Sequence, residues 1–95
     1  MTVLDDGAIS QELDSLPEWE RRGNEIVKTF KRKNFVGAIE FVNQVATLAE
    51  EQGHHPDIDI RWNKVTLTLS THSAGGLTMN DFELAKRIEA MAAQL

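Results

Sequence analysis

Between Asn34 and Gly53, apolar residues recur three and four positions apart, which is the spacing of one face of an α-helix. The stripe consists of Phe35, Ala38, Ile39, Val42, Val45, Ala46 and Ala49, widened by Phe41 and Leu48. Asn34 is a favoured N-cap and Gly53 a favoured helix stop, so we predict a helix of about five turns between them. Because a face this broad must be buried, the rest of the chain has to supply a second layer.

Strands supply that layer. The segment Val65–Ser70 alternates strictly between apolar and hydroxyl-bearing residues, the pattern of a half-buried strand, and is a candidate edge strand. Further strands are predicted at 19–22, 25–31 and 57–62. Gly23 and Asn24 are suited to the tight turn of the first hairpin, and Asn63 and Lys64 are expected to form the turn of the second.

Two shorter helices complete the pattern. Ser10 is the expected cap of a helix that Pro17 stops, and Thr78 is the expected cap of the last helix. The inner face of that last helix comprises Leu84, Ala85, Ile88, Met91, Ala92 and Leu95. Residues 1–7 are expected to form a disordered tail, and 8–95 a single domain, as the length of 95 residues suggests.

The predicted element order is therefore α-β-β-α-β-β-α. Hairpins rather than long crossovers join the strands, which implies a four-stranded antiparallel sheet. With the helices packed on one face of that sheet, the fold class is an α+β two-layer sandwich.

Composition excludes several functions. The chain has no cysteine, so disulfides, thiolate metal sites and cysteine nucleophiles are ruled out. A net charge of −5 argues against direct nucleic-acid binding, which depends on Lys and Arg. No apolar run reaches membrane-spanning length, and the N-terminal residues lack the features of a signal peptide. We therefore expect a cytoplasmic protein without membrane contact.

All three histidines, His54, His55 and His72, fall within one stretch of nineteen residues. The first two follow the helix stop at Gly53, and the third follows the last strand. Such residues are most often parts of a polar connection or a solvent-facing strand end. Histidine can, however, both give and take a proton near neutral pH, so this stretch is the candidate site for acid–base chemistry.

Two acids accompany the histidines. Asp81 lies three residues after Thr78 in a near-match to the capping box, yet it also shares a helix face with Leu84 and so points toward protein. Glu50 lies four residues before His54, where a negative charge at a helix C-terminus is mildly unfavourable. Each acid is therefore either a structural or surface residue or the partner of a histidine.

A metal site is the competing use of three histidines and two carboxylates. Adjacent histidines in extended chain point in opposite directions, and the sequence has no His-x-His or His-x₃-His pair. The spacing therefore favours acid–base chemistry over a metal site, but only weakly.

A signature with several parts runs through this region: Glu50-x₃-His54-His55-Pro56, Trp62-Asn63-Lys64-Val65, Leu69-Ser70-Thr71-His72, Gly76-Leu77 and Asp81. Together these segments resemble the pterin-4a-carbinolamine dehydratase family. The resemblance extends over nearly the whole chain and implies an α+β fold. It also implies dehydration of a 4a-hydroxytetrahydropterin to the quinonoid dihydropterin, within tetrahydrobiopterin recycling and without a metal or other cofactor.

The resemblance also implies residue roles. His54 and His72 would act as acids toward the departing hydroxyl, while His55 would bind the pterin and act as the base. Asp81 would orient a histidine. Substrate-binding positions carried over from the family are Glu50, Trp62, Ser70 and Thr71.

Family resemblance leaves a second class of function open. Some relatives are dimerisation cofactors of a transcription factor, and others are chaperones or regulators built on the same fold. The retained histidines favour the enzyme. We also expect a homodimer or homotetramer and a functional link to an aromatic amino-acid hydroxylase, whose reaction produces this substrate class.

Overall fold

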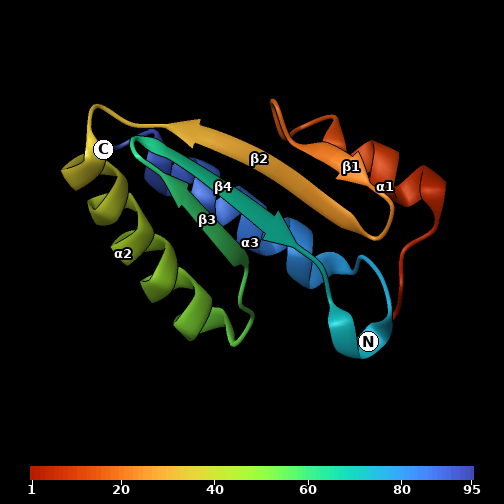
Figure 1. The fold of residues 1–95 in the computed structure, drawn as a ribbon. Coiled ribbons are helices and arrows are strands. Elements are labelled where there is room, and N and C mark those ends of the chain that lie inside the picture. The colour runs from red at the N-terminus through yellow and green to blue at the C-terminus, as the bar shows by residue number, and fades with distance from the viewer.

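Four antiparallel strands and three α-helices make up the computed structural model, which describes residues 1–95 (Figure 1). The elements are α1 (Asp6–Leu13), β1 (Glu20–Arg22), β2 (Glu25–Lys31), α2 (Phe35–Gln52), β3 (Asp57–Arg61), β4 (Lys64–Leu69), a 3₁₀ turn (His72–Ala74) and α3 (Met79–Ala92). The predicted α+β order α-β-β-α-β-β-α is confirmed. No helix combines the length and apolar character that crossing a bilayer requires.

The sheet has the strand order β1-β2-β4-β3. Strand β4 pairs with β2 on one side and with β3 on the other, so it lies inside the sheet. The prediction that Val65–Ser70 forms an edge strand is therefore wrong, because the edges are β1 and β3. Self-association as a homodimer or homotetramer stays a prediction.

One face of the sheet carries the core. Inward-facing residues of β2 and β4 pack against α2 and α3 in one hydrophobic cluster, whereas the opposite face carries hydroxyls such as Thr29 and Thr66. The main members of this cluster are Ile26, Phe30, Ala38, Phe41, Val45, Val65, Leu67, Leu69, Leu84, Ala85 and Ile88. The period-2 and period-3.6 patterns thus bury the faces that they predict. Leu95, expected on the inner face of the last helix, is 56% exposed beyond the end of α3.

The N-terminal helix begins earlier than expected. Its N-cap is Asp5, whose carboxylate accepts from the Ala8 N–H at 2.8 Å, so the prediction of a Ser10 cap is wrong. Aspartate caps as well as serine does, and Asp5 and Asp6 place negative charge where the helix dipole favours it. Two residues of the expected tail therefore lie in α1, and Leu4 donates a backbone hydrogen bond to Leu77 at 2.8 Å.

The turn between β3 and β4 lies one residue before the predicted Asn63-Lys64 pair, because Lys64 already belongs to β4. Trp62 adopts φ 54°, which large side chains rarely do, and Asn63 is buried. The Asn63 side-chain amide donates to the Arg32 carbonyl at 3.0 Å, and the Arg32 N–H donates to the Asn63 carbonyl at 2.7 Å. These contacts with the end of β2 account for the shifted turn.

The end of α2 determines where the chain enters the histidine segment. Gly53 adopts φ 65°, the left-handed conformation typical of helix stops. Its N–H donates to the Glu50 carbonyl at 3.3 Å, and the His54 N–H donates to the Ala49 carbonyl at 3.1 Å. This pair of bonds is the Schellman motif, which fixes the His54 backbone against the last helical turn.

Replacing Gly53 by alanine is expected to lower the free energy of unfolding by about 1 kcal/mol, because a Cβ is disfavoured in the left-handed region. Urea denaturation measures this change. The matched control is Gly7→Ala, where the backbone is α-helical and a Cβ would meet its nearest atom at an ordinary 3.6 Å. Alanine should be neutral or stabilising there, so equal losses in the two variants would contradict the assignment.

Candidate active site

An open cleft of about 240 Å³ lies at one end of the β3–β4 hairpin. Its lining comes from two segments, listed as Gly53, His54, His55, Ser70, Thr71, His72 and Ser73. The first segment precedes β3 and the second follows β4. Because these strands are antiparallel, with Asp57 opposite Thr68, the two segments meet at the same end of the sheet. The structure therefore brings His54, His55 and His72 to one cleft.

His54 is paired with a buried acid. Its Nε2 lies 2.6 Å from Asp81 Oδ1, while the His54 side chain is 11% exposed and the Asp81 side chain is fully buried. The two residues come from different parts of the chain, His54 from the segment just after α2 and Asp81 from the first turn of α3. A buried carboxylate needs partners of this kind, since an unpaired one would be costly.

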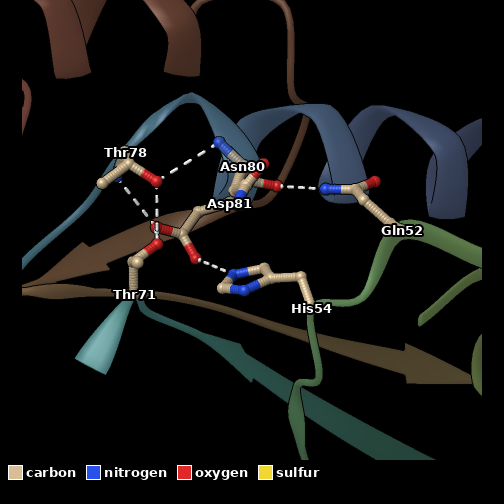
Figure 2. Close-up of polar contacts among 6 residues, drawn as sticks. All are labelled: Gln52, His54, Thr71, Thr78, Asn80 and Asp81. Atoms are coloured by element: carbon tan, nitrogen blue, oxygen red, sulfur yellow. Dashed lines mark hydrogen bonds and ion pairs between the residues drawn. The ribbon is translucent and has the colours of Figure 1, made fainter. Parts of the chain in front are cut away.

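Two further donors hold the other oxygen of Asp81. The Thr71 hydroxyl donates to Asp81 Oδ2 at 2.8 Å, and the Thr78 N–H donates to the same oxygen at 2.9 Å (Figure 2). The Thr78 hydroxyl caps α3 and lies 2.8 Å from the Thr71 hydroxyl. Asp81 thus completes a capping box and contacts a histidine at the same time.

The contacts of Asp81 indicate where the ring hydrogen of His54 lies. In its ionised form the Asp81 carboxylate only accepts hydrogen bonds, so Oδ1 then accepts from His54 Nε2–H. The neutral His54 ring is therefore the Nε2–H tautomer. His54 Nδ1 has no protein partner and is accessible to solvent, in a ring that lines the cleft.

The other two histidines are more exposed. His55 Nε2 bonds to the Glu50 carboxylate, with 62% of the His55 side chain and 76% of the Glu50 side chain accessible. His72 is exposed in the 3₁₀ turn and has no side-chain hydrogen bond. The three histidines therefore form two separate carboxylate pairs and one free ring. No three His, Asp or Glu side chains gather in a geometry that could hold one metal ion.

The remaining predicted residues divide between the cleft and other positions. Ser70 lines the cleft, and Thr71 does so as well, although its hydroxyl is engaged by Asp81 and Thr78. Trp62 is 69% exposed in the turn at the other end of the β3–β4 hairpin, about 15–20 Å away at the rise of an antiparallel strand. The structure does not bring Trp62 to this cleft.

The sequence reasoning missed Gln52. This last residue of α2 donates from Nε2 to the carbonyl of Asn80 at 2.7 Å (Figure 2). Asn80 is the residue immediately before Asp81, the partner of His54. A glutamine one position before a helix stop is an ordinary surface residue in sequence. Nothing in its local pattern points to a partner 28 positions away.

Comparison with known proteins places the chain among related sequences. A family model described as pterin 4 alpha carbinolamine dehydratase matches residues 2–91. A protein of Roseiflexus sp. (strain RS-1) with the provisional name pterin-4-alpha-carbinolamine dehydratase is 59% identical over 88 residues, covering 93% of this chain and 95% of the relative. A similarly named protein of Nocardia farcinica is 53% identical over 90 residues, with 95% of each chain covered.

Two solved structures share the fold. A transcriptional coactivator/pterin dehydratase from Brucella melitensis superposes with a TM-score of 0.92 and 33% identity, covering 96% of this chain and 99% of that chain. A pterin dehydratase-like protein identified as a RuBisCO assembly factor in the alpha-carboxysome gives a TM-score of 0.63 and 25% identity. That match covers 78% of this chain and 86% of the other.

Proposed function

Because the chain belongs to the pterin 4 alpha carbinolamine dehydratase family, we propose that it eliminates water from a 4a-hydroxytetrahydropterin to give the quinonoid dihydropterin. Enzymes of this class are hydro-lyases. The reaction needs one proton delivered to the departing 4a-hydroxyl and one proton removed from ring nitrogen N5. Aromatic amino-acid hydroxylases produce this substrate class, so the reaction would serve the recycling of tetrahydrobiopterin.

The observation that carries the proposal is the pair of carboxylate–histidine contacts on one cleft. His54 is bonded to Asp81 and His55 to Glu50, in both cases through Nε2. Each ring therefore keeps Nδ1 for a bound molecule. An elimination requires one acid and one base within reach of the same substrate, and two histidines with separate carboxylates suit that requirement.

In the proposed acid step, the protonated His54 ring donates from Nδ1 to the 4a-hydroxyl as the C4a–O bond breaks. The positive charge on this ring lies against the Asp81 carboxylate before the transfer. His72 is the second group assigned to the leaving hydroxyl. It has no protein partner that would compete with the substrate.

In the proposed base step, neutral His55 accepts the N5 proton on Nδ1 while Glu50 holds the Nε2–H. The electron pair of the N5–H bond then forms the C4a=N5 double bond, so the ring system is neither oxidised nor reduced overall. Water leaves with the proton from His54. Both rings exchange protons with solvent through the open cleft, which resets them for the next turnover.

Stopped-flow absorbance tests the proposal directly. The 4a-hydroxytetrahydropterin is generated enzymatically and mixed with this protein, and the rate of quinonoid dihydropterin formation is followed. We expect a rate that rises in proportion to protein concentration above the rate in buffer. A rate independent of protein concentration would exclude the dehydratase function.

A second candidate is a non-enzymatic role as a dimerisation cofactor, regulator or chaperone. It is favoured by the descriptions of the two solved structures as a coactivator/dehydratase and as an assembly factor. Such a role needs a binding surface and makes no use of the cleft. A chain with this role alone would show no dehydration and no sensitivity to histidine replacement.

A further inference from the structure

Three side chains near the end of α2 are tied to α3. Glu51 bonds to Arg87 at 2.6 Å, Gln52 to the Asn80 carbonyl at 2.7 Å, and His54 to Asp81 at 2.6 Å. The first tie is on the surface, with side chains 55% and 40% exposed. The third is the proposed acid pair, and the second reaches α3 at the residue immediately before Asp81.

The Gln52 tie joins a side chain at the end of α2 to the backbone of α3. Gln52 is two residues before His54, and Asn80 is the residue immediately before Asp81 (Figure 2). The acceptor is a main-chain carbonyl, so the bond fixes the first turn of α3 itself rather than a mobile side chain. A shift of one helix end against the other would change both this bond and the His54–Asp81 contact.

The net contribution of Gln52 to fold stability is expected to be small. Its Oε1 is buried without a hydrogen-bond partner, which costs free energy on the scale that its Nε2 bond gains. The Asn80 carbonyl lies at the second position of α3, where an intrahelical bond from residue 84 is expected as well. An apolar side chain of the same shape would therefore leave no group in this contact unpaired.

We propose that Gln52 is a positioning residue, which holds the end of α2 against the start of α3 so that His54 Nε2–H stays aligned with Asp81. This inference rests on the proposed function, because it assigns Gln52 to the site of that reaction. Gln52 does not line the cleft and acts only through His54. Alignment within a fraction of an ångström is what such supporting contacts contribute to catalysis.

The test is Gln52→Met, which keeps the length and shape of the side chain and removes both polar atoms. We expect kcat for dehydration to fall about 10-fold with KM nearly unchanged. The ¹⁵N shifts of the neutral His54 ring should change from a single Nε2–H tautomer to a mixture. The matched control is Glu51→Met, which removes the neighbouring surface tie and should leave kcat and the tautomer as in the wild type.

Gln52→Leu is measured in parallel, so that the result does not depend on the folding of one variant. Wild-type kcat together with a single His54 tautomer in these variants would overturn the inference. If the Gln52 variants show a mixture of His54 tautomers but the wild-type protein does not accelerate dehydration, Gln52 positions His54 and the proposed function is rejected. The NMR measurement thus distinguishes a failure of the Gln52 inference from a failure of the proposed dehydratase function.

Discussion

Replacing His54 by alanine is expected to lower kcat for dehydration by about 100-fold or more, because a positioned acid–base group contributes roughly 10²–10⁴-fold. His54 is the histidine whose orientation is most constrained, since its partner Asp81 is fully buried and itself held by two donors. Stopped-flow kinetics on 4a-hydroxytetrahydropterin measure the change. The fold should persist, because the His54 side chain contacts Asp81 at the edge of an open cleft.

Chemical rescue separates a lost proton donor from a disturbed fold. Alanine leaves a space beside Asp81 and the cleft that free imidazole could fill. We expect added imidazole to restore part of the rate in His54→Ala and to leave the wild-type rate unchanged. A His54→Ala protein with the wild-type kcat would show that His54 takes no part in the chemistry, even if the chain is a dehydratase.

Local sequence signals predicted the helices and strands well where a local cause exists. Helix α2 has the predicted cap Asn34 and the predicted stop Gly53, because both act on backbone groups within a few residues. The order of the strands in the sheet, by contrast, is not determined by interactions within a few residues. β4 pairs with β2, about 40 positions away in sequence, and this pairing makes β4 internal although its own pattern is equally suited to an edge.

The turn at Trp62 shows the same limit. A left-handed tryptophan would not be predicted from propensity, since Asn63 and Lys64 are better turn formers. Asn63 stays in the turn as its second residue, and it makes two hydrogen bonds with Arg32. A tertiary contact thus outweighs the local turn preference, and the turn moves by one residue.

In the candidate site, too, local sequence signals predicted some features, and contacts between distant residues determined the others. The family resemblance predicted the histidines and Asp81 as candidate site residues, and the clustering of the histidines in the sequence supported this only weakly. Their pairing could not be predicted, because His54 and Asp81 are 27 positions apart, and either acid could have partnered any of the three histidines. Gln52 gave no signal at all, since only the packing of α2 against α3 brings it to Asn80.

Replacing Asp81 is expected to have the largest effect on stability. Its carboxylate accepts from the Thr71 hydroxyl, the Thr78 N–H and His54 Nε2 in a fully buried position. Hydrogen bonds to a charged group contribute about 1.5–3 kcal/mol each, and the partners left behind would be desolvated without compensation. We therefore expect Asp81→Ala to lower the free energy of unfolding by about 3 kcal/mol and Tm by more than about 10 °C.

Asp81→Asn distinguishes charge from shape. A carboxamide of the same size has one accepting oxygen and one NH₂ group, so it cannot accept from all three donors, and its NH₂ group pairs with His54 Nε2 only if the ring hydrogen moves to Nδ1. We expect a loss of about 2 kcal/mol in urea denaturation and, under conditions where the variant is folded, a kcat as low as that of His54→Ala. Glu83→Gln, which removes an exposed acid from the same helix, should change neither quantity. An Asp81→Asn protein as stable and active as the wild type would show that Asp81 does not serve as the ionised acceptor of three donors, and the assignment of the His54 tautomer would fall with it.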